Sequence, residues 1–109
     1  MKNLILIEPL GYLEMLSLNS QAELVLTDSG GIQEETTFRQ IPCLTLRDNT
    51  ERPCTITIGT NELVEYNYEA VAEKINQIET GTYKKGAIPP YWDGHSTKRI
   101  VEVLRKELN

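Results

Sequence analysis

The sequence is short of aromatic residues, cysteine and histidine, and each shortage limits the kind of site the chain can build. Aromatic residues make up 6% of the 109 residues, so the apolar interior must consist mainly of leucine, isoleucine and valine. The two cysteines, Cys43 and Cys54, fit neither a CxxC redox motif nor a zinc-binding spacing, and we expect both to be reduced thiols. No metal ion and no cofactor are expected.

The sequence also lacks a long hydrophobic run and an excess of basic residues. No apolar stretch approaches the roughly 20 residues that a membrane-spanning helix needs. Near the N-terminus, Glu8 and Pro9 interrupt a short apolar run and no signal-peptide pattern is present, which predicts a cytoplasmic protein. The formal net charge of -5, from 11 basic and 16 acidic residues, argues against general binding to nucleic acid or to an anionic membrane.

What the sequence does contain is a regular alternation of strand-like and helix-like segments. Apolar runs predict strands at 3–7, 22–28 and 41–47, the first two of a kind that is covered on both faces, and a short fourth strand at 61–65. Helical spacing of apolar residues predicts four helices, at 12–21, 31–40, 68–79 and 96–108. The polar segment 48–53 is predicted to be a loop at the carboxyl end of the third strand.

This order of elements implies an α/β fold. Strands separated by helices pair in parallel through right-handed crossovers, so we expect a parallel sheet of three to four strands with flanking helices. The pattern is half of a doubly wound nucleotide-binding sheet, and the chain starts directly on a predicted strand. We therefore expect residues 1–109 to form one partial Rossmann-like domain.

One stretch, "LVLTDSGGIQEE" at 24–35, marks the end of a predicted strand and the start of a predicted helix. Ligands of open α/β sheets gather at the carboxyl ends of the strands, and a helix N-terminus favours phosphate. Gly30 and Gly31 would let a ligand approach the backbone closely, and the Ser29 hydroxyl could donate to a phosphate oxygen. The alternative is a tight turn in which Ser29 or Asp28 caps the helix.

Charged residues next to this stretch suggest further contacts. Glu34 and Glu35 are adjacent on the helix and diverge by about 100°, so only one of them is expected to face the cleft, where it could accept hydrogen bonds from a ribose diol. Arg52, on the loop at the same sheet edge, could neutralise a diphosphate. The alternative for Arg52 is an exposed side chain paired with Glu51.

Four motifs in order, "LTDSGGIQEE", "RDNTERP", "GTNELV" and "WDGHSTKRI", resemble the C-terminal part of the non-hydrolysing UDP-N-acetylglucosamine 2-epimerases. The resemblance covers nearly the whole chain. It implies a C-terminal portion of a two-domain enzyme of the GT-B type, which interconverts UDP-GlcNAc and UDP-ManNAc by eliminating UDP and adding it back. In this family the acidic residues that move the proton lie in the N-terminal domain, so no epimerase activity is expected from this chain alone.

The resemblance also assigns contacts to particular residues. It implies that Ser29, Gly30 and Gly31 contact the diphosphate of UDP, that Glu35 contacts the ribose, and that the backbone near Met15 holds the uracil. The expected partners are a UDP-sugar and either a second copy of the chain or the missing N-terminal domain, without nucleic acid or membrane. Two alternatives stay open: a non-catalytic UDP-binding or interaction module completed by a partner chain, and half of a GT-B-type glycosyltransferase.

Overall fold

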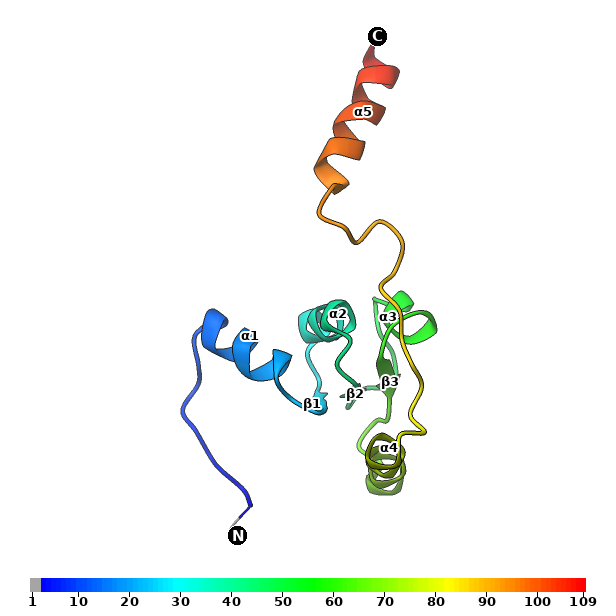
Figure 1. Cartoon of the computed structure of the whole chain (residues 1–109). Coiled ribbons are helices and arrows are strands. Elements are labelled where there is room, and N and C mark those ends of the chain that lie inside the picture. Colours follow the sequence, from blue (N-terminus) through cyan, green and yellow to red (C-terminus); the bar gives the residue numbers. More distant parts are fainter. Residues whose placement is uncertain (1–2) are drawn as a thin grey trace.

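The computed structural model describes residues 3–109, and a three-stranded parallel sheet lies at its centre (Figure 1). The strands are β1 (Val25–Thr27), β2 (Cys43–Thr45) and β3 (Asn61–Leu63), in the spatial order β1-β2-β3. Leu44 of the central strand stands opposite Leu26 on one side and Glu62 on the other. The predicted parallel sheet with flanking helices is confirmed.

Helices connect the strands and extend beyond them. The described helices are α1 (Tyr12–Ser20), α2 (Gly30–Arg39), α3 (Cys54–Thr57), α4 (Tyr68–Thr80) and α5 (Ser96–Leu108). Four of them agree with the predicted helices to within two residues at each end. The single-turn α3 was not predicted, because its four residues "CTIT" are too few to show helical periodicity.

The interior of the sheet is small and largely polar. Cys43, Leu44 and Thr45 of β2 are 0% exposed because the strand has neighbours on both edges and helices on its faces. Besides Cys43 and Leu44, the buried hydrophobic residues of the described chain are Val25 and Val64. Burial raises the pKa of the Cys43 thiol, which keeps it protonated.

The prediction of a strand at 3–7 is wrong. The segment is irregular, and Leu4, Ile5, Leu6 and Ile7 are 57–87% exposed. An apolar run becomes a strand only where another strand accepts its backbone hydrogen bonds, and in the described chain β1 pairs only with β2. The periodicity of the sequence could not show that this pairing partner was lacking.

A segment after α4 crosses back to β3 and is held there by two side chains. The Tyr83 hydroxyl donates to the Thr60 carbonyl at 2.6 Å, and the Lys84 ammonium donates to the Ile56 carbonyl at 2.7 Å. Lys84 also pairs with Glu62 at 2.9 Å. Burial, with the nearby Glu62 charge, raises the pKa of Tyr83, so its hydroxyl stays a hydrogen-bond donor.

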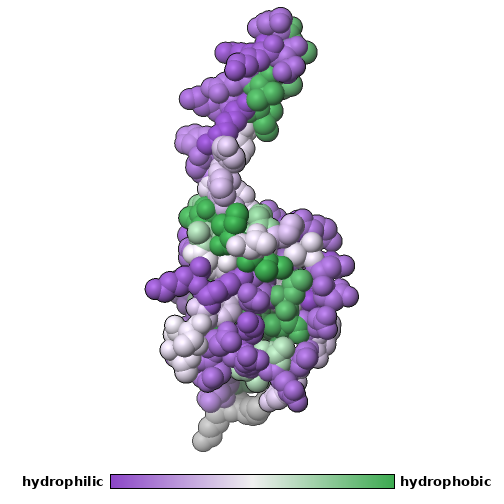
Figure 2. All heavy atoms as spheres, turned by 90° about the vertical axis from the view of Figure 1, so that its right-hand side faces the viewer, coloured by the Kyte–Doolittle hydropathy of each residue, from purple (hydrophilic) through white to green (hydrophobic). Residues whose placement is uncertain are grey.

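Helix α5 stands apart from the sheet and the other helices (Figure 1). Its start is held by Arg99, which pairs with Asp93 and lies over the Tyr91 ring at 4.9 Å. The hydrogen bond from Arg99, followed by one from the His95 amide, lowers the pKa of Asp93 to about 2. Apolar residues of α5 form a stripe that is open to solvent, as Figure 2 shows, with its members 42–81% exposed: Ile100, Val101, Val103, Leu104 and Leu108.

Among residues 3–109, no helix combines the length and the apolar character that crossing a membrane requires.

Candidate functional site

The candidate site lies where β1 ends and α2 begins. The Ser29 amide donates to the Thr27 hydroxyl at 3.1 Å, and this turn directs the chain from the strand into the helix. Ser29 occupies the N-cap position of α2 in an extended conformation, but its side chain makes no capping hydrogen bond. Ser29 is thus the N-cap residue, as the alternative interpretation expects, but its hydroxyl and the first amides of α2 remain able to donate to a ligand.

The two glycines of the motif have different surroundings. A Cβ atom on Gly30 would lie 3.2 Å from the guanidinium carbon of Arg52 and would collide with the nearer nitrogen. A Cβ atom on Gly31 would meet no atom within 4 Å. Gly30 thus gives room to the Arg52 side chain, and Gly31 leaves bare backbone facing open space.

Arg52 brings a positive charge to this helix start, and carboxylates partly neutralise it. Its Nε donates to Glu34, and its Nη1 lies 3.5 Å from Glu51. Glu51 also pairs with Arg47 at 3.3 Å, and the hydrogen bond from Arg47 lowers the pKa of the Glu51 carboxyl. The alternative pairing of Arg52 with Glu51 is therefore present, but the contact with Glu34 is much the shorter.

Glu35 shares a cleft with Glu34, so the expectation that only one of these adjacent carboxylates faces the cleft is wrong. It lines an open cleft of about 440 Å³ together with Tyr12 and Leu16 of α1, Phe38 of α2, and Trp92. Met15 is 37% exposed on α1 and is not among the residues that line this cleft. The structure thus brings Ser29, Gly30 and Arg52 together, and it places Glu35 and Met15 outside that group.

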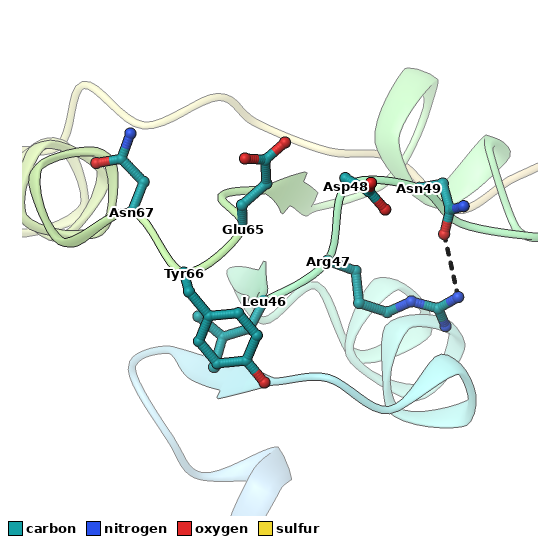
Figure 3. Close-up of a pocket in the computed structure, with 7 residues that line it drawn as sticks. All are labelled: Leu46, Arg47, Asp48, Asn49, Glu65, Tyr66 and Asn67. Atoms are coloured by element: carbon teal, nitrogen blue, oxygen red, sulfur yellow. Dashed lines mark hydrogen bonds between the residues drawn. The ribbon is translucent and has the colours of Figure 1, made fainter.

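A larger, shallow cavity of about 800 Å³ opens at the carboxyl ends of β2 and β3 (Figure 3). It is lined by residues 46–49, which follow β2, and by 65–67, which follow β3. Arg47 donates to Asn49 at 3.2 Å within the first of these loops. None of the residues expected to contact UDP lines this cavity, although Arg47, Asp48 and Asn49 belong to the motif "RDNTERP".

Sequence reasoning missed a set of buried polar side chains beneath Arg52. Gln33 and Asn61 are 0% exposed, and the Asn61 amide donates to the Gln33 side-chain oxygen at 3.0 Å. Gln33 lies in the middle of the "SGGIQEE" motif, and its position on the buried face of α2 was the available signal. Nothing in the sequence near Asn61 indicated that its partner stands 28 residues earlier.

Within the described residues, no three His, Cys, Asp or Glu side chains cluster closely enough to hold a metal ion.

The sequence of this chain is similar to those of known proteins of one family. The sequence pattern that describes UDP-N-acetylglucosamine 2-epimerase matches residues 1–105. The UDP-N-acetylglucosamine 2-epimerases of Methanocaldococcus jannaschii and Escherichia coli K12 are 47% and 42% identical to this chain, over 94% and 95% of its length. The chain spans 28% and 29% of the length of these two relatives.

Solved structures agree with the sequence comparison. The UDP-GlcNAc 2-epimerase of Neisseria meningitidis, bound to UDP-GlcNAc, matches with a TM-score of 0.77 at 40% identity, covering 92% of this chain and 28% of the other. The M. jannaschii enzyme in complex with UDP-GlcNAc and UDP matches with a TM-score of 0.71 at 50% identity, covering 92% and 27%. The predicted Rossmann-like, GT-B-type architecture is thereby confirmed, and half of a glycosyltransferase is disfavoured. The chain belongs to the UDP-N-acetylglucosamine 2-epimerase family.

Proposed function

We propose that this chain binds the UDP portion of a UDP-sugar, UDP-GlcNAc or its 2-epimer, at the start of α2. The observation that carries the proposal is the Arg52 guanidinium lying against Gly30, where the positive end of the helix dipole adds to its charge. A diphosphate there would meet one arginine, one free hydroxyl and the first helical amides. The residues proposed to contact UDP are Met15, Ser29, Gly30, Gly31, Glu35 and Arg52.

Within the proposed site each part of UDP has its own contact. Ser29 and the amides at Gly30 and Gly31 would donate to the diphosphate, which Arg52 would neutralise. Glu35 would accept hydrogen bonds from the ribose hydroxyls, and the open cleft beside it, lined by Tyr12 and Leu16 of α1, leaves room for a sugar and base. The uracil contact near Met15 rests on the family resemblance alone.

The proposed reaction role follows from the charge of this site. When UDP leaves the sugar, negative charge grows on the diphosphate, and fixed donors with a nearby arginine stabilise it. We propose that residues 1–109 form the UDP-binding part of an epimerase that eliminates UDP and adds it back. The family resemblance places the acidic residues for the proton transfer at C2 in the N-terminal domain, and this chain spans 28% of the length of one relative, so the chain by itself is proposed to be inactive. A cytoplasmic location stays a prediction.

Calorimetry with UDP and with inorganic pyrophosphate tests the proposed contacts separately. Arg52→Ala is expected to raise the dissociation constants of both ligands about tenfold to a hundredfold, because it removes charge-assisted hydrogen bonds worth about 1.5–3 kcal/mol. Ser29→Ala is expected to raise both dissociation constants about fivefold. Glu35→Ala is expected to weaken the binding of UDP but not that of pyrophosphate, because pyrophosphate has no ribose for Glu35 to contact.

The matched control is Arg105→Ala, which removes the same charge from the last turn of α5. It should bind both ligands as the unchanged chain does. The absence of heat and of NMR chemical-shift changes at millimolar UDP would refute the proposal.

We further propose that another polypeptide surface covers the apolar stripe of α5, either a second copy or the remainder of a longer epimerase. Five apolar side chains of this helix are at least 42% exposed, and exposed apolar stripes of this kind mark contact surfaces. The same stripe could also be covered by the partner chain of a non-catalytic UDP-binding module, the alternative function given above.

The isolated chain is accordingly expected to self-associate, with a sedimentation coefficient that rises with concentration. Leu104→Glu should shift the chain towards monomer, because it places a charge within the stripe. Lys106→Glu, about 200° around the helix from Leu104, is the control and should leave the association unchanged. A monomer at every accessible concentration would contradict a second copy as the covering surface and leave the remainder of a longer epimerase.

A further inference from the structure

A closed ring of hydrogen bonds surrounds the main chain of Arg52. The Arg52 amide donates to the Thr50 hydroxyl at 3.0 Å, which donates to the Gln33 side-chain oxygen at 2.7 Å. The same oxygen accepts from the Asn61 amide at 3.0 Å, and that amide also donates to the Thr55 hydroxyl at 3.1 Å. The Thr55 hydroxyl donates to the Arg52 carbonyl at 2.7 Å, which closes the ring.

The ring permits one arrangement of its protons. Each threonine hydroxyl has a single proton to donate, and the two hydrogens of the Asn61 amide are both used. The Asn61 oxygen accepts from the Thr45 hydroxyl at 2.5 Å, which fixes the orientation of the amide. Gln33, Thr45, Thr55 and Asn61 are all 0% exposed, so breaking one bond leaves a polar atom buried without a partner.

The ring also reaches the other side of the candidate site. The Gln33 amide donates to the Ser29 carbonyl at 3.3 Å, immediately before the first residue of α2. Gln33 therefore contacts the backbone at Ser29 directly, and it reaches the Arg52 amide through Thr50. It reaches the Arg52 carbonyl through Asn61 and Thr55. One side chain links the helix start and the arginine loop.

We propose that Gln33 and Asn61 are positioning residues of the anion site, which set the Arg52 guanidinium against the start of α2. The inference rests on the proposed function, since it assigns these amides a role in that same site. Arg52 comes from the loop 48–53, and a loop side chain samples many positions unless its backbone is held. The ring holds both the N–H and the C=O of that residue, which fixes the point from which its side chain starts, and Glu34 accepts from the Nε near its other end.

Threonine-to-valine substitutions in the full 109-residue chain test this role. Thr50→Val removes the acceptor of the Arg52 amide, and Thr55→Val removes the donor to its carbonyl, without a large change in shape. We expect amide hydrogen exchange at Arg52 to accelerate about fivefold to tenfold in both variants, and the UDP dissociation constant to rise by a similar factor. Serine at either position keeps the hydroxyl and should restore both readouts.

Thr57→Val is the matched control, because Thr57 is an exposed threonine nearby whose hydroxyl, 3.3 Å from the Pro53 carbonyl, lies outside the ring. It should change neither readout. A purely structural ring would lower the urea midpoint in Thr50→Val while Arg52 exchange and UDP affinity of the folded chain stayed unchanged, and that result would overturn the inference.

The two readouts also separate this inference from the proposed function. Hydrogen exchange at Arg52 is measured without ligand, so a chain that does not bind UDP but shows the expected exchange changes refutes the proposed function and leaves the positioning role intact. A chain that binds UDP equally well with threonine or valine at positions 50 and 55 supports the proposed function and refutes the positioning role.

Discussion

Alanine at Gly30 is expected to weaken UDP binding about tenfold or more while the fold survives. The new Cβ would stand 3.2 Å from the Arg52 guanidinium carbon and closer still to one nitrogen, so the guanidinium must leave the helix start. The end of an arginine side chain moves at little cost, which spares the fold. The loss comes from the charge-assisted hydrogen bonds that Arg52 is proposed to make with the diphosphate.

Alanine at Gly31 should give the same loss of binding for a different reason. Its Cβ meets no protein atom, and alanine favours a helix over glycine by about 1 kcal/mol, so the fold should become no less stable. The methyl group would instead occupy the space proposed for the diphosphate. Calorimetry with UDP and urea unfolding measure the two effects separately. Gly31→Ala with unchanged UDP affinity would place the diphosphate elsewhere.

Alanine at Leu44 is expected to cause the largest loss of stability in the chain. Leu44 is 0% exposed on the central strand, and emptying such a position costs about 2–5 kcal/mol. Small domains are stable by about 5–15 kcal/mol in total, and few apolar residues are buried here, so this change removes much of the free energy of unfolding. Urea unfolding followed by circular dichroism measures the shift.

Leu26→Ala is the matched control for this experiment. Leu26 stands opposite Leu44 in the register of the sheet but is 46% exposed on the edge strand β1. Its loss should cost about half as much, since nearly half of its surface already meets solvent. Equal costs for the two leucines would mean that β1 is covered in solution by a surface that the described chain does not contain, such as a second copy.

The interior of this chain is largely polar, so hydrophobicity alone could not predict which residues are buried. Seven polar residues are buried within the described chain, against four hydrophobic ones. Apolar runs correctly predicted β1, β2 and β3, because each strand carries its own pattern. They gave no sign that Gln33 and Asn61 are as deeply buried as Leu44, since a polar side chain becomes buried only where partners elsewhere in the chain satisfy it.

The order of strands and helices, the parallel sheet and the position of the turn at Ser29, where anion binding is proposed, were determined by the sequence itself. These features depend on residues close together in the chain: apolar runs, helical spacing, and glycines at a strand end. The failed strand at 3–7 shows the limit of such patterns, because a strand also needs a neighbour.

Only the tertiary structure decided which charges and amides meet. It chose Glu34 rather than Glu35 as the partner of Arg52, set the guanidinium against Gly30, and joined Gln33 to Asn61. The partners in these contacts lie 18 to 28 residues apart. Local sequence patterns carry no information about such pairs, because the contacts arise only when the strands pair and the loop 48–53 folds over the start of α2.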